Sequence, residues 1–502
     1  MSSKTIVLVA GALASLSAMA ALERATPESQ GISSRAISAW IDRVEKEVKY
    51  LHSFVIVRHG KIVSEGWWAP YRKDLPHRLF SHSKSFTSTA IGLAVDEGKL
   101  DLDERVAEIF PEKMPASPNE NLRSLRVRDL LTMNAGSAPD RFRTNPRSDW
   151  MREYLAGDFS KRPGTAFKYD SSSTYMLAEV VQRKTGRPMM DYLEEKFFGP
   201  VGITDVVTTV SPSGCPCGGW GMAMKTEDLV RFGLVYLNGG VWEGRQILSR
   251  DWVRLATAKQ TWSGWSDKPE ARPESDWHQG YGFQFWRCRF NAFRADGAGG
   301  QFTLMLPDQD AVISCTALFG DYQGAFNTIW EGLLAAMQEG ALPENAEAAA
   351  ALEKRCSSLT LPVVAGETVG AVRAKTTWNL KPNAAGYKTL TFEPESNGWR
   401  ITLAAPGTSR AYAIGYGEWR KGEVTAANEA YDPLGAFGLL GNQEIATSGA
   451  WTSPTVFEMK TWFVREAEEG SLKIDFATGK PKATYVENGA CVKTVTLELE
   501  AE

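Results

Sequence analysis

Hydrophobic and polar positions follow two different periods along this chain. Up to about residue 340, apolar residues recur mainly at helical spacing. Within Ser33 to Val48, for example, one helical face collects Ile37, Trp40, Ile41 and Val44. Beyond about residue 358, apolar and polar residues alternate in short runs between turn residues, as in Trp399 to Leu403. The pattern predicts a helix-rich first part and an all-β second part.

The first part also contains β-rich runs, which lie near its two ends. Phe54 to Val57 and Ile62 to Val63 flank the turn dipeptide His59-Gly60, an arrangement typical of a hairpin. The later runs that resemble strands are Tyr281 to Arg287, Phe302 to Leu306 and Ala311 to Leu318. The helices predicted around them include Thr174 to Thr185, Met189 to Phe198, Thr226 to Asn238 and Phe326 to Met337. We therefore expect an α+β fold, with one antiparallel sheet built from both ends of the domain and helices packed over it.

The change of pattern also sets the expected domain boundaries. Residues 22–342 form the first domain, and residues 343–357 form a polar helical linker. Residues 358–502 form the β-rich domain, either a sandwich or a small barrel.

Residues 1–21 have the pattern of a signal peptide. Lys4 is the single charge, Ile6 to Leu16 is an apolar run, and Ala18-Met19-Ala20 resembles a cleavage site. The run is too short and too rich in small residues for a comfortable membrane span, although an uncleaved anchor is the alternative. The sequence thus predicts export to the periplasm or the cell exterior, without a stable membrane span after cleavage.

Composition narrows the function further. The chain has 502 residues, of which 43% are hydrophobic, and a net charge of -4 without basic blocks, which argues against a nucleic-acid partner. Its six cysteines include the pair Cys215 and Cys217. With five histidines and no second Cys/His pair at ligand spacing, a loop disulfide or free thiols is favoured over a metal site. We expect no metal and no cofactor.

The main candidate for chemistry is Ser81-His82-Ser83-Lys84, which leads into a predicted helix with the apolar run Ala90 to Val95 and a stop at Gly98. A serine three residues before a lysine places hydroxyl and amine one helical turn apart on the same face. A buried lysine that is held neutral can take a serine proton, and the helix N-terminus favours a nearby oxyanion. By itself the four-residue pattern is weak, because it recurs by chance and often marks a solvated helix start.

A second candidate is Tyr169, which follows Pro163-Gly164 and precedes a predicted helix. A tyrosine beside a lysine can act as a proton acceptor and later as a donor. The alternative is an ordinary buried aromatic residue whose hydroxyl caps a backbone group.

With these motifs in order, the chain resembles the serine β-lactamase and penicillin-binding protein superfamily. The branch it resembles contains class C β-lactamases, family VIII esterases, D-aminopeptidases and 6-aminohexanoate-dimer hydrolases. Phe80 to Thr87, Pro163 to Ser171 and Gly218 to Gly233 carry the resemblance, which spans roughly residues 25 to 340. It implies a β-lactamase/D,D-peptidase-like fold, an antiparallel sheet flanked by helices plus a helical subdomain.

The resemblance also implies roles for individual residues. Ser81 would be the acylated nucleophile, Lys84 its activator, and Tyr169 the general base and acid. The family's third motif would fall at Ala295-Asp296-Gly297, and the backbone N–H groups of Ser81 and Ala298 would form the oxyanion hole.

Two departures from the family pattern bear on the substrate. Ser171 stands where the family most often has asparagine, which weakens the expected hydrogen bonds to a substrate amide and to Lys84. Ala295 removes a cationic residue, and Asp296 adds a negative charge that would repel a substrate carboxylate. We therefore expect an ester or amide hydrolase rather than a true β-lactamase, with Asp296 orienting a substrate amine or hydroxyl. The alternative is a solvated turn aspartate.

Several further residues have both a functional and an ordinary structural interpretation. Trp262, Trp265 and Trp277 are expected to rim the cleft, with ordinary packing as the alternative. Arg141, Arg143 and Arg147 would favour acidic substrates, but a solvated loop explains them as well. His77 and His82 flank the serine. His82 is adjacent to it and should point away from it on a helix.

The sequence thus predicts a serine hydrolase that cleaves a small ester or amide through an acyl-enzyme on Ser81. One alternative is a peptidase or amidase that acts on D-amino-acid or peptidoglycan-like substrates. The other, from a different class, is a catalytically silent binding protein on the same scaffold.

Overall fold

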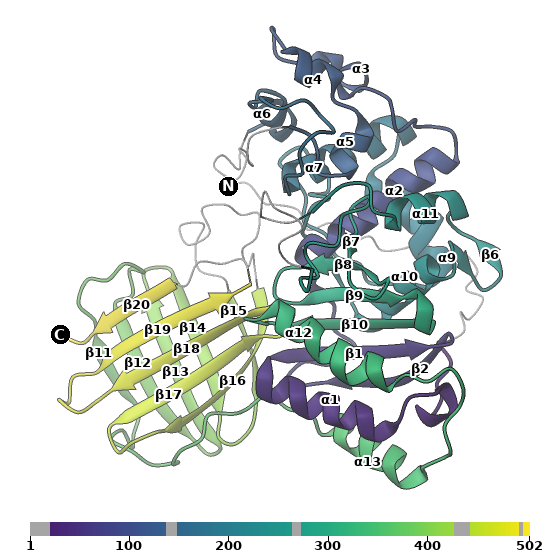
Figure 1. Cartoon of the computed structure of the whole chain (residues 1–502). Coiled ribbons are helices and arrows are strands. Elements are labelled where there is room, and N and C mark those ends of the chain that lie inside the picture. The colour runs from purple at the N-terminus through teal and green to yellow at the C-terminus, as the bar shows by residue number, and fades with distance from the viewer. Residues whose placement is uncertain (1–20, 137–147, 264–272, 426–441, 491–494) are drawn as a thin grey trace. The chain divides into compact units, whose positions relative to one another are not determined.

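The computed structural model describes residues 21–136, 148–263, 273–425, 442–490 and 495–502 (Figure 1). The chain divides into two compact units. The first comprises the residues up to Gly66 together with Arg78–Ser357, and the second comprises Trp67–His77 together with Ser358–Glu502.

A six-stranded antiparallel sheet forms the centre of the first unit, in the order β2-β1-β10-β9-β8-β7. Its strands are β1 (Leu51–Arg58), β2 (Lys61–Trp67), β7 (Trp286–Arg287), β8 (Phe293–Gly297), β9 (Gln301–Leu306) and β10 (Ala311–Ala317). Figure 1 shows the early hairpin β1–β2 beside the late strand β10, and Ile56 lies opposite Ile313 in the ladder. The predicted α+β architecture, with one sheet built from both ends of the domain, is confirmed.

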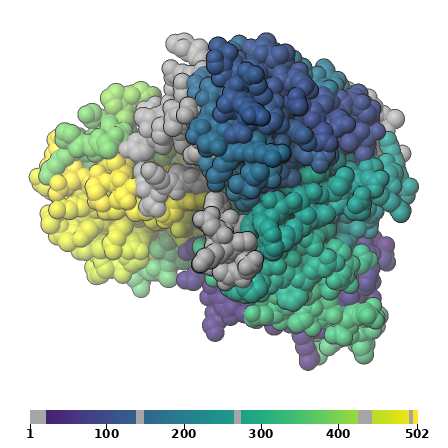
Figure 2. Space-filling view, turned by 45° about the horizontal axis from the view of Figure 1, so that its top comes forward, coloured from purple at the N-terminus to yellow at the C-terminus, as the bar shows by residue number. Residues whose placement is uncertain are grey.

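Helices cover both faces of this sheet. The helices of the unit are α1 (Ser34–Glu47), α2 (Ser83–Asp96), α3 (Val106–Ile109), α4 (Glu120–Ser124), α5 (Val127–Leu131), α6 (Trp150–Leu155), α7 (Ser171–Thr185), α8 (Met189–Leu193), α9 (Gly199–Val201), α10 (Thr226–Leu237), α11 (Arg250–Thr257), α12 (Tyr322–Thr328) and α13 (Ala346–Ser357). Four two-residue strands lie outside the central sheet: β3 (His77–Arg78), β4 (Ala223–Met224), β5 (Val241–Trp242) and β6 (Arg245–Gln246). Figure 2 shows the blue helical segments and the later teal segments of this unit as adjoining surfaces.

The two sheet faces can be told apart on neighbouring residues of β9. Phe302 contacts Phe326 of α12, with ring centroids 5.1 Å apart. Thr303 points the other way, where its methyl group lies so close to Gly233 of α10 that a Cβ there would be 2.8 Å from it. On the α12 face, Trp40 of α1 packs edge-on against Phe54. Because successive strand residues alternate between faces, β1, β8, β9 and β10, whose residues are all buried, are covered on both sides.

The sequence pattern missed one strand. β8 has the sequence Phe-Arg-Ala-Asp-Gly, which carries two charged residues and reads as a loop. All five residues are nevertheless buried, because Arg294 and Asp296 pair with each other. The run predicted from Tyr281 to Arg287 contributes only the two residues of β7 to the sheet.

The second unit is the all-β domain that the alternating pattern predicted. Its strands are β11 (Thr376–Asn379), β12 (Thr389–Glu395), β13 (Gly398–Ala405), β14 (Thr408–Gly415), β15 (Arg420–Thr425), β16 (Asn442–Trp451), β17 (Val456–Phe463), β18 (Glu468–Asp475), β19 (Lys482–Gly489) and β20 (Val495–Glu500). They form one sheet, and an antiparallel bridge between Leu380 and Ala501 joins its first and last strands. Phe392, Trp451 and Phe457 lie in the aromatic core that the sheet encloses.

Within the described residues, none of the helices combines the length and apolar content that crossing a bilayer requires.

Candidate active site

Ser81 and Lys84 meet as the three-residue spacing predicted. Ser81 lies in a short 3₁₀ turn, Phe80–His82, which leads directly into α2. Lys84 Nζ is 3.0 Å from Ser81 Oγ. The lysine side chain is buried, with 1% of its surface exposed, whereas Ser81 is partly exposed. The hydroxyl is thus open to a ligand while its amine neighbour is shielded.

Two further oxygen atoms surround the Lys84 amine. Its Nζ donates to Ser171 Oγ at 2.9 Å and to the carbonyl oxygen of Gly219 at 2.6 Å. A Cβ at Gly219 would lie 2.9 Å from the Ser171 carbonyl oxygen and 3.4 Å from Lys84 Nζ, so glycine permits this close approach. Ser171, the residue that replaces the family's asparagine, therefore still reaches the lysine.

Helix α7 holds Ser171 in place through the cap that precedes it. Asp170 accepts hydrogen bonds from the backbone N–H of Ser172 at 2.9 Å and of Ser173 at 3.2 Å. An aspartate at this position satisfies N–H groups that would otherwise lack acceptors at the helix start. The helix thus begins at Ser171, three residues before the predicted start, and its first side chain faces Lys84.

The backbone is strained immediately before the nucleophile candidate. Phe80 has a φ of 48°, in the left-handed region that a bulky residue rarely occupies. Such a conformation costs about 1–3 kcal/mol and persists only where the surrounding structure enforces it. Phe80 itself is buried, and the Leu79 N–H donates to the Met222 carbonyl oxygen at 2.8 Å.

Tyr169 belongs to an aromatic wall beside this pair. Its ring centroid lies 4.9 Å from Lys84 Nζ. The ring stacks on Trp286 at 5.6 Å and meets Tyr281 edge-on at 6.3 Å. Trp277 also packs against Trp286, at 4.9 Å. Tyr169 is half-buried, unlike the fully buried Tyr281, so a ligand can reach it.

The end of β8 lies against the serine turn. A Cβ on Gly297 would be 2.0 Å from the Leu79 carbonyl oxygen and 3.1 Å from the His82 nitrogen. Only glycine therefore allows β8 to approach the turn that carries Ser81. This contact brings the sequence Ala295-Asp296-Gly297-Ala298 to the nucleophile candidate.

Asp296 is neither solvated nor in a turn. Its Oδ2 accepts a hydrogen bond from Arg294 Nε at 2.6 Å, and 8% of the residue is exposed. Burial raises the pKa of Asp296, an effect that the adjacent Arg294 charge opposes. Because the two opposite charges are paired, the repulsion of substrate carboxylates expected from Asp296 is largely cancelled.

Arg294 is fully buried and is sandwiched between aromatic rings. Its guanidinium lies 4.3 Å from the Trp277 ring and 4.5 Å from the Phe326 ring. It also donates to the Asp276 carbonyl oxygen and to Cys288 Sγ. The ion pair thus lies directly behind the aromatic wall that contacts Tyr169.

Two side chains that the sequence did not single out hold the turn after β8. Gln301 Nε2 donates to the carbonyl oxygens of Ala298 at 2.8 Å and Ala317 at 2.7 Å. The Gly299 N–H donates to the Tyr322 hydroxyl. The position of Gln301 directly before the predicted strand Phe302 to Leu306 is the signal in the sequence for its contacts. The sequence offers no signal for the contact between Gly299 and Tyr322.

His82 is excluded as a base by its surroundings. It is fully buried, its Nε2 is 2.9 Å from Thr303 Oγ1, and its ring stacks on Phe86. Burial lowers the pKa of His82 to about 3, so the ring is neutral at physiological pH. The prediction that it points away from Ser81 is confirmed.

The remaining sequence candidates are scattered. Trp262 is 51% exposed, and the Lys259 amine lies over its ring. His77 is buried in the second unit beside Tyr71. Cys215 and Cys217 are buried free thiols. The candidates outside the described residues are Trp265, Arg141, Arg143, Arg147, Cys491 and the leader 1–20.

With this geometry established, the family can be assigned. The beta-lactamase family model matches residues 43–318, which is more than half of the chain. The chain belongs to the beta-lactamase family. The resemblance predicted from the ordered motifs is therefore confirmed.

Two curated relatives and one solved structure illustrate how distant this beta-lactamase-family chain is from known proteins. It is 26% identical over 326 residues to the 6-aminohexanoate-dimer hydrolase of Paenarthrobacter ureafaciens, covering 60% of this chain and 82% of the relative. It is 25% identical over 305 residues to penicillin-binding protein 4 of Amycolatopsis lactamdurans, covering 53% and 77% respectively. A Bacteroides dorei protein proposed to be a beta-lactamase superposes with a TM-score of 0.52 at 17% identity, covering 60% of this chain and 99% of that protein. At this identity the structural likeness shows the beta-lactamase fold alone.

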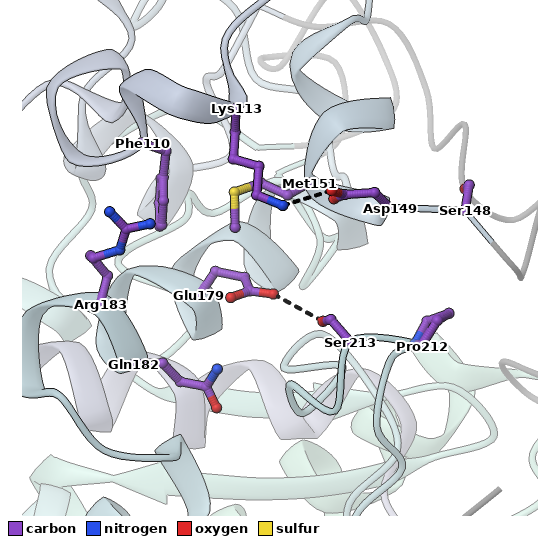
Figure 3. A pocket seen from close by; sticks show the side chains of 10 residues that line it. All are labelled: Phe110, Lys113, Ser148, Asp149, Met151, Glu179, Gln182, Arg183, Pro212 and Ser213. Carbon is purple, nitrogen blue, oxygen red and sulfur yellow. Dashed lines mark hydrogen bonds and ion pairs between the residues drawn. The ribbon is translucent and has the colours of Figure 1, made fainter.

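A separate cavity of about 550 Å³ is lined by Glu179, Gln182 and Arg183 of α7 together with residues of the neighbouring segments (Figure 3). It contains none of the three catalytic candidates that the family resemblance implies. Its charged side chains already contact neighbours: Lys113 pairs with Asp149 at 2.6 Å, and Arg183 lies over the Phe110 ring. These contacts make the cavity the weaker candidate for a reaction site.

The neutral state of His82 predicts a pH dependence of stability. The pKa of about 3 in the folded chain lies below the ordinary value of 6.5, so the unfolded chain binds the extra proton and acid favours unfolding. Stability from this residue is complete above pH 6.5 and falls as the pH drops toward 3. Between pH 7 and pH 5 the loss is about 2 kcal/mol, from roughly 1.4 kcal/mol per pKa unit. Urea unfolding at both pH values should show this loss in the wild type but not in His82→Gln. Equal losses in the two proteins would contradict the assignment.

The close approach of Gly297 to the Leu79 carbonyl oxygen leaves no room for a methyl group at position 297. Gly297→Ala should push β8 away from the serine turn and slow reaction of Ser81 with a fluorophosphonate by about tenfold or more, because such displacements cost catalysis heavily. Gly320→Ala is the control, since a Cβ there meets nothing within 4 Å. Unchanged labelling of the Gly297 variant would show that β8 does not set the site.

Proposed function

We propose that this protein is a serine hydrolase that cleaves an ester or amide bond of a small substrate through an acyl-enzyme on Ser81. One observation carries the proposal: a partly exposed hydroxyl lies 3.0 Å from the buried amine of Lys84, which in turn faces the half-buried Tyr169. Nucleophile and proton acceptors within this reach are the arrangement that hydroxyl-based acyl transfer requires. Hydrolysis of amides and esters is also the chemistry of its family.

In the proposed acylation step, Ser81 Oγ attacks the substrate carbonyl while its proton passes to the Lys84 and Tyr169 pair. The lysine contacts neutral oxygen atoms of Ser81, Ser171 and Gly219, so a neutral amine can keep two contacts as donor and take the serine proton through its lone pair. Tyr169 then returns a proton to the leaving alcohol or amine. Water, activated by the same pair, attacks the acyl-enzyme to release the acid and restore the serine hydroxyl.

The oxyanion would be held by the backbone N–H groups of Ser81 and Ala298. Within the described residues, neither N–H donates to a backbone carbonyl oxygen in a turn or loop. The contact between Gly297 and the serine turn supports this pairing, because it brings Ala298 near Ser81. Gln301 supports it further by fixing the Ala298 carbonyl oxygen.

The aromatic wall favours a neutral, apolar acyl or aryl group as substrate. Tyr169 and Trp277 are the partly exposed rings of this wall, and the buried Tyr281 and Trp286 pack against them. The first alternative is a peptidase or amidase on D-amino-acid or peptidoglycan-like substrates, and a penicillin-binding protein among the relatives favours it. A catalytically silent binding protein is the other, and the alanine at position 295 is the feature that favours it. We also propose export, on the pattern of the first 21 residues.

The central proposal is tested with p-nitrophenyl acetate and butyrate. Ser81→Ala should lose at least about a thousandfold in kcat/KM, because the covalent step has no other nucleophile. Ser88→Ala is a matched control on the same helix, where the hydroxyl only donates to the Phe283 carbonyl oxygen. Equal rates for wild type and Ser81→Ala would refute the mechanism. Release of D-alanine from a peptide that ends in D-alanyl-D-alanine, without ester hydrolysis, would favour the peptidase.

We propose that Asp296 orients a substrate amine or hydroxyl through Oδ1. Arg294 Nε donates to the other oxygen, Oδ2, and 8% of the residue is exposed. Asp296→Asn should lower the preference for p-nitrophenyl 6-aminohexanoate over p-nitrophenyl hexanoate by about tenfold, because a charge-assisted hydrogen bond is lost. The double variant Arg294→Met/Asp296→Asn avoids leaving a buried cation unpaired and should lose the same preference. An unchanged ratio in both variants rules the role out.

A further inference from the structure

The second unit is not a simple C-terminal appendage, because it includes eleven residues from the early part of the chain. Trp67–His77 cluster with Ser358–Glu502 rather than with the residues on either side of them. We refer to Trp67–His77 as the arm. The chain thus passes into the second unit after Gly66, returns at Arg78, and enters it again after Ser357.

The arm is bound by several kinds of contact within its unit. The Tyr71 hydroxyl donates to the Glu466 carbonyl oxygen at 3.1 Å, and its ring contacts Trp462. Arg72 pairs with Glu444 of β16, with a nitrogen to oxygen distance of 2.5 Å. The backbone of Ala69 bonds to Leu359 and Leu361, and Leu75 packs with Ala446 and Val464. Hydrogen bonds, an ion pair and apolar packing all fix the same short segment.

The arm ends close to the nucleophile along the chain. Only Arg78, Leu79 and Phe80 separate His77 from Ser81. Of these, Phe80 holds the left-handed conformation, which a free chain would leave. A strained residue keeps its geometry only when the chain is fixed on both sides. On the far side the chain is fixed by α2. On the near side the Leu79 N–H bond to the Met222 carbonyl oxygen holds it, and the arm holds the residues before that.

We propose that the second unit positions the catalytic serine by anchoring the arm, and that Tyr71, Arg72 and Leu75 are positioning residues for Ser81. This inference rests on the proposed function. Loosening the arm lets the turn around Phe80 relax, which moves Ser81 Oγ away from Lys84 while the aromatic wall around Tyr169 is left in place. The effect should therefore fall on kcat rather than on KM.

The experiment compares two pairs of changes in the full-length protein. Tyr71→Phe/Glu444→Gln removes the hydroxyl bond and the ion pair that hold the arm. The control Tyr416→Phe/Glu395→Gln removes a tyrosine bond to the Gly366 carbonyl oxygen and ion pairs to Arg400 and Arg420, all within the second unit and away from the arm. Ser81 labelling by a fluorophosphonate, kcat and KM for a p-nitrophenyl ester, and circular dichroism are measured well below the melting temperature.

The arm pair is expected to slow Ser81 labelling and kcat by about tenfold, with KM unchanged, while the control pair stays within about twofold of wild type. Leu75→Val, a milder change, should slow labelling in the same direction in a fully folded protein. Equal labelling rates for arm and control pairs, or a loss confined to KM, would overturn the inference. A wild-type protein that is not labelled at all would instead overturn the proposed function.

Discussion

The site depends on the burial of one amine among neutral oxygen atoms. Lys84 is almost completely shielded from solvent, and its nitrogen contacts a serine hydroxyl, a second hydroxyl and a backbone carbonyl. Bringing these groups together requires the cap of α7, a glycine at position 219 that lets the backbone come close, and a strained turn at Phe80. Each of these features costs conformational freedom or backbone energy. Each also helps to fix the surroundings of Lys84 Nζ.

The parts of this site that lie close in sequence could be predicted from it. Serine and lysine one helical turn apart, and a tyrosine before a predicted helix, follow from local spacing alone. The two-domain division and the sheet built from both ends follow from periodicity. Local pattern could not reveal β8, because its charged residues satisfy each other only once Arg294 and Asp296 are buried side by side. The neutralised aspartate consequently changes what the sequence had suggested about substrate charge.

The aromatic residues around Tyr169 were only partly foreseen, for a similar reason. The sequence points to Trp277 as a residue of the cleft, whereas Trp286 has the pattern of an ordinary strand residue and Arg294 carries no local signal. A guanidinium between rings contributes through cation–π attraction, which depends on spatial arrangement rather than on spacing in the chain. The wall and the ion pair behind it form one packed group, so changes at either should affect both.

The arm has a consequence for how the protein assembles. Its bonds to Glu444 and Glu466 join residues that are 372 and 395 positions apart in the sequence, which makes them contacts of very high sequence separation. Because a chain is made from its N-terminus, Arg72 and Tyr71 meet these two partners only after nearly the whole polypeptide has been synthesised. The arm therefore reaches its final conformation late, after the strands of the second unit that bind it have formed.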